Sequence, residues 1–165
     1  MGDGGTDRFD ALMASLAEPM FIVTTSADDG ERSGCLVGFA TQCSIDPPRF
    51  LACLSDTNHT ARVAARAVVL AVHVVPAGRH DLAEHFGGTS GDDLDKFADV
   101  DWRPGPGGVP LLEACPDRFV GRILERIGLG DHTGYLLAPL QATARGGGEA
   151  VTLPEVTDIT PGHAP

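Results

Sequence analysis

The sequence predicts a mainly β protein, built as an antiparallel β-barrel with a few short helices. The first observation is turn content: 21 glycines and 12 prolines among 165 residues, against only 5% aromatic residues, are typical of short strands joined by turns. The second is that the helical and β-favouring runs do not alternate regularly, which argues against a doubly wound parallel sheet. Closure into a barrel would remove exposed strand edges, and the chain length suits one domain.

The first predicted element is a helix over residues 6–16. Its apolar residues recur at the i, i+3, i+4, i+7 spacing that places them on one face, at Phe9, Leu12, Met13 and Leu16. Residues 20–26 and 32–40 are the next two runs, and both favour β-strands. The Asp29-Gly30 pair between them is typical of a hairpin turn, so we expect two antiparallel strands here.

The middle of the chain predicts two more strands with a helix between them. Asp46-Pro47-Pro48 indicates a rigid turn before a third strand at residues 50–54. Polar residues from Thr57 onward are typical of a helix start, and the helix continues to about residue 65. Residues 68–75 form an apolar, β-branched run that predicts a buried strand, with His73 as a hydrogen-bonded core histidine.

The last third of the chain is less regular. Its predicted elements are a short helix at 81–86, a second helical turn at 92–100, an irregular Pro- and Gly-rich stretch at 104–110, and strands at 118–127 and 132–143. We expect residues 1–6 and the Gly- and Pro-rich residues 146–165 to be flexible ends, which leaves 7–145 as the folded domain.

Charge and cysteine content exclude several classes of function. Twelve Lys and Arg against 23 Asp and Glu give a net charge of -11, which argues against nucleic acid or an anionic membrane as a partner. The longest apolar runs are too short to span a bilayer. The four cysteines lack CxxC spacing, so we expect no metal site, reduced thiols and a cytoplasmic location. No GxGxxG motif opens a helix after a strand, so a Rossmann site is not supported.

Residues 34–44 are an unusual strand because glycines and small polar residues interrupt it. Gly34 and Gly38 would allow a ligand to approach the backbone closely, and Thr41, Gln42 and Ser44 add polar groups. Such a surface suits a flat heteroaromatic ligand. The alternative is a strand end that bulges into the turn at Asp46.

Two further polar clusters have a functional and a structural interpretation. Residues 55–60 cap a predicted helix, and the same free amides could bind a phosphate, with His59 adding charge. Asp131-His132 is either a solvated loop pair or a catalytic dyad. No serine or cysteine motif accompanies it, so hydrolase-type nucleophilic catalysis is not supported.

Taken together, these stretches resemble the flavin reductase family, whose members have the FMN-binding split-barrel fold. The resemblance covers about Phe9 to Leu140, and the segments that carry it occur in the order of the family. They are Gly38–Ser44, Asp46-Pro47-Pro48, Ser55–Thr60, Phe86-Gly87, Asp95-Lys96-Phe97-Ala98, Asp101-Trp102 and Gly130-Asp131-His132.

The resemblance implies a homodimer that binds FMN, with FAD as an alternative, and reduces it with NADH or NADPH. The residues it assigns to the flavin are Gly38, Phe39, Ala40, Thr41, Gln42, Cys43, Ser44, Ser55, Asn58, His59, Thr60, Lys96 and Phe97. Asp131 and His132 match the segment associated with the nicotinamide donor. No catalytic acid or base is expected, because hydride transfer within a stacked pair mainly requires positioning.

The resemblance also implies that reduced flavin is used in place or passed to a partner monooxygenase. Two alternatives remain open at this point. One is a reductase of the same fold that uses a deazaflavin, and the other is a non-catalytic flavin or haem carrier.

Overall fold

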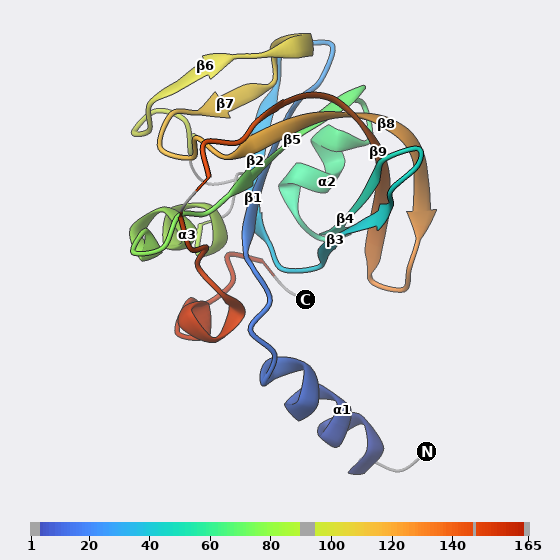
Figure 1. Cartoon of the computed structure of the whole chain (residues 1–165), viewed down its shortest axis with the longest axis vertical. Helices are drawn as coiled ribbons and strands as arrows, with labels where there is room; N and C mark the ends of the chain where they lie inside the picture. Colours follow the sequence, from blue (N-terminus) through green and yellow to red (C-terminus); the bar gives the residue numbers. More distant parts are fainter. Residues whose placement is uncertain (1–3, 90–94, 147, 164–165) are drawn as a thin grey trace.

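The protein is mainly β, and its principal element is a seven-stranded antiparallel sheet (Figure 1). The computed structural model describes residues 4–89, 95–146 and 148–163. In spatial order, the sheet contains β2 (Arg32–Val37), β1 (Phe21–Ser26), β5 (Val69–Val74), β8 (Arg118–Gly128), β9 (His132–Thr143), β4 (Arg49–Ser55) and β3 (Ala40–Ser44). The predicted β class is therefore confirmed. Because β2 and β3 are separate edge strands, the sheet is not closed into the expected barrel.

The predicted strand at 32–40 is divided in two. β2 ends at Val37, and β3 begins at Ala40 after a break at Gly38 and Phe39. The reason is a change of partner, since β2 pairs with β1 whereas β3 pairs with β4. A register shift between Gln42 and Ser44 then marks an irregularity in β3, in line with the predicted bulge.

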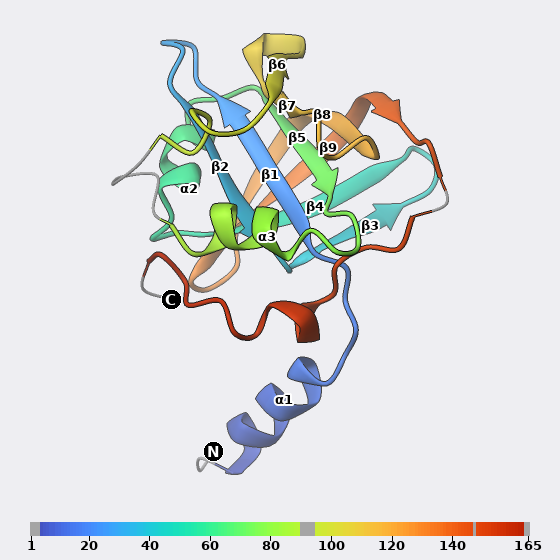
Figure 2. The same cartoon turned by 90° about the vertical axis from the view of Figure 1, so that its left-hand side faces the viewer.

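Within the described residues, three α-helices accompany the sheet. α1 (Gly4–Ala14) projects away from the body of the molecule, whereas α2 (His59–Ala64) packs against β1, β2 and β4, and α3 (His80–Gly87) packs against β2 (Figures 1 and 2). These confirm the predicted helices at 6–16, 57–65 and 81–86. α1 already begins at Gly4, so only residues 1–3 of the expected flexible start lie outside the described residues.

The segment between α3 and β8 differs from its prediction. Residues 92–94 of the predicted second helical turn lie outside the described residues, and 95–100 form hydrogen-bonded turns rather than a helix. The stretch predicted to be irregular contains a small hairpin of β6 (Trp102–Pro104) and β7 (Pro110–Leu112), linked by a 3₁₀ turn at Pro106–Gly108. Positive φ angles at Gly107 and Gly108 allow this tight reversal despite the prolines.

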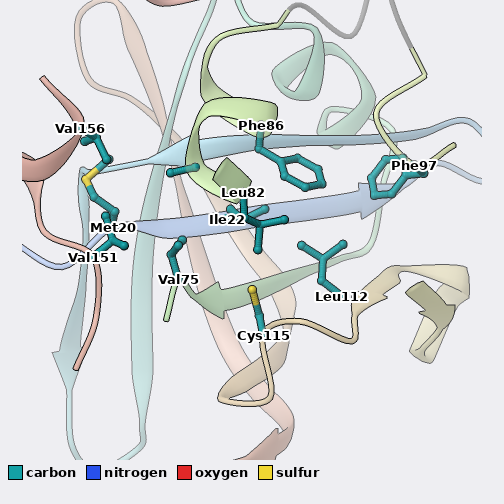
Figure 3. Packing of buried hydrophobic residues seen from close by; sticks show 11 residues of the cluster. Met20, Ile22, Val75, Leu82, Phe86, Phe97, Leu112, Cys115, Val151 and Val156 are labelled. Carbon is teal, nitrogen blue, oxygen red and sulfur yellow. The ribbon is translucent and has the colours of Figure 1, made fainter. Parts of the chain in front are cut away.

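The C-terminal segment that we expected to be flexible packs onto the core. Val151 and Val156 are 2% and 6% exposed, and they lie beside Met20 in one core cluster (Figure 3). A 3₁₀ helix, η2 (Leu153–Val156), is held by a capping box between Thr152 and Glu155. The boundary expected at residue 145 therefore lies too early, because this segment supplies part of the core.

Candidate functional site

The sheet brings together two of the segments singled out in the sequence. β4 and β9 pair with Ser55 directly opposite His132. Next to this pair, the N–H of Asp56 donates to the carbonyl of Asp131 at 3.0 Å, and the Thr133 hydroxyl donates to the Asp56 carboxylate at 2.7 Å. The loop that opens α2 and the turn between β8 and β9 thus form one polar unit.

A groove of about 220 Å³ lies beside this unit. Five of the predicted site residues line it: Gly38, Phe39, Ser55, Asn58 and His132. Its apolar walls come mainly from β2, the first strand in the sheet order, and β4, the last but one, and these two strands contact one another. A half-open cavity with apolar walls and polar groups at one end suits a flat ring system with a polar substituent.

Gly38 and Phe39 form the break between β2 and β3 at the groove. A Cβ atom added at Gly38 would lie 3.3 Å from Met20 Sδ, so a larger side chain must displace Met20. The carbonyl of Phe39 accepts a hydrogen bond from the N–H of Cys53 at 2.9 Å, while its ring is 63% exposed. The ring centroid lies 5.1 Å from that of His132, and the two tilted rings form the outer rim.

His132 is oriented by its neighbour. Its Nδ1 lies 2.7 Å from an oxygen of the Asp131 carboxylate, and this hydrogen bond lowers the pKa of Asp131. With the Nδ1 proton directed at the carboxylate, the ring is fixed and Nε2 is the nitrogen left for other contacts. The pair is therefore more than two solvated loop residues, because His132 is also a wall of the groove.

The loop before α2 supplies hydroxyl and amide groups. Asn58 Oδ1 caps the helix by accepting the N–H of Thr60 at 2.8 Å, and the Ser55 and Thr57 hydroxyls lie 3.1 Å apart. The hydroxyl of Thr60, by contrast, is buried and lies 2.8 Å from that of Ser33. The structure therefore does not bring the Thr60 side chain to the groove.

His59 and Lys96, the two potential cations, are engaged elsewhere. His59 Nε2 lies 3.1 Å from the carboxylate of Glu31. Lys96 is 5% exposed, and its Nζ donates to the carbonyls of Gly34 and Phe86 at 3.1 and 2.8 Å. Burial lowers the pKa of Lys96. Both residues line a second cavity of about 20 Å³ next to Asn58, so they lie behind the groove rather than in it.

Phe97 and β3 also differ from their expected positions. The Phe97 ring lies in the core between Phe86 and Trp102, with centroid distances of 5.8 and 5.9 Å, and it does not reach the groove. The strand residues Ala40, Thr41, Gln42, Cys43 and Ser44 lie outside the groove lining. β3 is an edge strand, so one side of its backbone has no strand partner and is open to a ligand.

The groove also contains residues that the sequence reasoning missed. Leu153 and His163 come from the C-terminal segment, and His163 Nδ1 lies 3.2 Å from the hydroxyl of Thr57. Met20 comes from the residue before β1. These were missed because the C-terminal residues were expected to be flexible, although Thr152 and Glu155 have the spacing of a capping box.

Other kinds of site have less support in the described residues. Within 4–89, 95–146 and 148–163, no group of three or more His, Cys, Asp or Glu side chains is arranged to hold a metal ion. A larger cavity of about 550 Å³ lies between α3 and the loop after β7, and it contains none of the predicted site residues. In the same described part, no helix combines the length and the apolar character needed to cross a bilayer.

Two relatives share most of their length with this chain. One relative is the "FMN reductase (NADH) RutF" of Klebsiella pneumoniae, 33% identical over 129 residues that cover 77% of this chain and 77% of the relative. Another is the "4-hydroxyphenylacetate 3-monooxygenase reductase component" of Salmonella typhimurium, 31% identical and covering 79% and 77%.

A solved structure extends the similarity to the fold. The NADH:FAD oxidoreductase SgcE6 of Streptomyces globisporus, in complex with NAD and FAD fragments, is 25% identical and superposes with a TM-score of 0.78, covering 91% of this chain and 90% of SgcE6. The family described as "flavin reductase like domain" matches residues 13–153, which include every residue of the groove except His163. The chain therefore belongs to the flavin reductase-like domain family.

Proposed function

We propose that the protein is an NAD(P)H-dependent flavin reductase that transfers hydride from the nicotinamide to FMN, with FAD as an alternative acceptor. One observation carries the proposal: the groove joins the Gly38–Phe39 break, the loop that opens α2, and His132 with its Asp131 partner. The names of the relatives, FMN reductase (NADH) and monooxygenase reductase component, support it.

The residues of the groove fit a flavin. The walls are apolar where a ring system would lie, and the hydroxyl and amide groups of Ser55, Thr57 and Asn58 are gathered at one end, where a phosphate needs donors. His59 lies next to them, whereas the N–H of Thr60 already donates to Asn58 Oδ1. When bound, the flavin supplies the chemistry by accepting hydride at N5 from a stacked nicotinamide. The protein itself needs to bind and align the two rings.

We assign the flavin ring to the groove at the Gly38–Phe39 break, with the open edge of β3 beside it. Gly38 has no side chain to block the approach, and the edge strand β3, from Ala40 to Ser44, has a strand partner on one side only. Lys96 does not line the groove. Its Nζ donates to the carbonyls of Gly34 and Phe86, and these hydrogen bonds help to fix the position of β2. Phe97 supports the same region from within the core.

We assign the nicotinamide donor to the rim formed by Asp131, His132 and Phe39. The Asp131 carboxylate fixes the His132 ring, which leaves its Nε2 to contact the donor. No proton has to move for hydride transfer between two rings, which fits a site without a general acid or base.

We further propose a homodimer with a split-barrel architecture. The groove holds about 220 Å³, below the roughly 300 to 1,000 Å³ of sites for ligands of drug size. Its rim residue Phe39 is largely exposed, so a second copy placed against the rim would deepen the groove. Because one relative is named as the reductase component of a monooxygenase, we propose that a monooxygenase consumes the reduced flavin.

An anaerobic bleaching experiment tests the proposed reaction. The purified protein is titrated with FMN or FAD, freed of unbound flavin, and mixed with NADH or NADPH while the visible absorption of the oxidised flavin is followed. Loss of that absorption at a rate far above the protein-free control is the expected result. Retained flavin that neither donor bleaches would refute the reductase and leave a carrier or a deazaflavin-dependent enzyme.

A further inference from the structure

The apolar face of α1 is uncovered. Phe9 and Leu12 are 59% and 57% exposed, Met13 and Leu16 are 37% and 38% exposed, and α1 contains no buried residue. Figures 1 and 2 show the helix extending from the body of the protein, with no other described element beside most of its length.

A helix of this size does not persist alone in water. α1 has 11 residues and begins with two glycines, whereas isolated helices shorter than about 12 to 15 residues are marginal even with favourable sequences. Its amphipathic pattern therefore needs a second surface. That surface must bury the four apolar side chains to stabilise the helix.

The body of the same molecule is poorly placed to supply that surface. The N–H of Met20 donates to the carbonyl of Val151 at 2.8 Å, and the N–H of Leu153 donates to the carbonyl of Glu18 at 2.9 Å, which fixes the direction in which the chain leaves the body. At the end of α1, the N–H groups of Ser15 and Leu16 donate to the carbonyls of Leu12 and Met13, so the helical turn continues to Leu16. Only Ala17 remains as a link, too short for α1 to fold back.

A membrane is also a poor fit for α1. Its polar face carries Asp7 and Asp10 against one Arg8, whereas helices that lie in a membrane surface carry Lys and Arg on that face. The chain as a whole has a net charge of -11, so an anionic bilayer would repel it.

The chain itself carries a second uncovered apolar surface, which we call the outer patch and define as Phe39, Leu51 and Leu129. Phe39 and Leu129 are 63% and 47% exposed. The N–H of Leu129 donates to the carbonyl of His132, whose ring contacts Phe39. A Cβ atom built at Gly134 would lie 2.8 Å from Leu129 Cδ1 and 3.1 Å from Leu51 Cδ1, so both leucine side chains lie over Gly134 on the same face of the sheet.

We propose that α1 docks on a second copy of this chain and covers its outer patch. In a two-fold symmetric dimer, α1 of each copy covers the outer patch of the other copy. Neither apolar surface then remains exposed. The outer patch adjoins the rim of the groove at Phe39, so the docked helix lies next to the partner's site. This inference rests on the proposed homodimer and specifies what holds it together.

Analytical ultracentrifugation of four variants tests the inference. Leu12→Glu places a charge in the apolar face of α1, and Ala11→Glu is its matched control on the opposite face. Leu129→Glu places a charge in the outer patch, and Leu140→Glu, at an exposed position outside the patch, is its control. Because each substitution acts twice per dimer, we expect both Leu12→Glu and Leu129→Glu to raise the dimer dissociation constant at least hundredfold. Both controls should stay within about threefold of wild type.

Amide hydrogen exchange supplies a second measurement. The α1 amides should be protected at protein concentrations where the dimer forms and exchange freely where it dissociates. A wild-type monomer would refute the homodimer, and this inference with it. A wild-type dimer that Leu12→Glu leaves intact would refute only the docking of α1. Protection of α1 that appears only with lipid vesicles, or only with a monooxygenase, would also overturn it.

Discussion

Acidification should destabilise the folded protein through His73, which lies on β5 and is 0% exposed. Its Nδ1 donates to the carbonyl of Ile22 at 3.0 Å, and its Nε2 accepts the N–H of Leu112 at 3.1 Å. Only the neutral ring, with its proton on Nδ1, can make both hydrogen bonds. Burial accordingly lowers the pKa of His73 from 6.5 to about 4.

The sign and size of the effect follow from this pKa. The folded-state pKa lies below the unfolded one, so the stabilisation by neutral His73 is fully present above pH 6.5 and is lost as the pH falls towards about 4. At about 1.4 kcal/mol per pH unit, the whole loss is about 3 kcal/mol, and about 2 kcal/mol of it is reached at pH 5.

Urea unfolding of wild type and His73→Gln at about pH 8 and pH 5, at one protein concentration, measures this loss. The wild-type advantage in free energy of unfolding should shrink by about 2 kcal/mol at the lower pH. His80→Gln is the control: its hydrogen bond to Asp158 raises the pKa of His80, so that stabilisation fades as the pH rises. An advantage of His73 that is equal at both pH values would refute the reasoning.

Three further substitutions test the site and the domain boundary. Gly38→Val presses against Met20, which lines the groove, so flavin affinity should fall at least tenfold while the protein stays folded; stoichiometric flavin retained after gel filtration would contradict this. His132→Ala should raise the Michaelis constant for the nicotinamide more than it raises the dissociation constant for flavin, and steady-state kinetics with a flavin titration compare the two. Val156→Ala should lower the free energy of unfolding by about 1 to 2 kcal/mol, whereas a loosely attached tail would give no change in urea.

Local patterns in the sequence were sufficient for most of the fold. Periodic apolar spacing located α1, β-favouring and apolar runs located β1 and β5, and the Asp29-Gly30 turn located the first hairpin, because these features depend on neighbouring residues. The break at Gly38 could not be predicted in this way. It arises from pairing with β1 on one side and β4 on the other, and these partners are distant in the sequence.

The candidate site was predicted in part, for a similar reason. Ser55 and His132 were both singled out, but their direct pairing depends on the register of β4 with β9. The resemblance also assigns Thr60 and Phe97 to the flavin, and in the structure their side chains lie in the interior rather than at the groove. A polar or aromatic residue in a site-like motif can equally satisfy a buried hydrogen bond or fill the core, and only packing decides between these uses.

The segment just before β1 meets the C-terminal segment at the groove, and this explains why the C-terminal segment is ordered despite its composition. Met20 pairs with Val151 through the backbone, and both side chains lie in the core cluster that includes Val156 (Figure 3). These backbone contacts fix the direction in which the chain runs from β1 to α1, and they place Leu153 and His163 at the groove. Glycine and proline content alone suggested a mobile tail, but alternating apolar residues around a capping box determine its structure. A substitution that weakens the contact between Met20 and Val151 should therefore alter both the groove and the direction of α1.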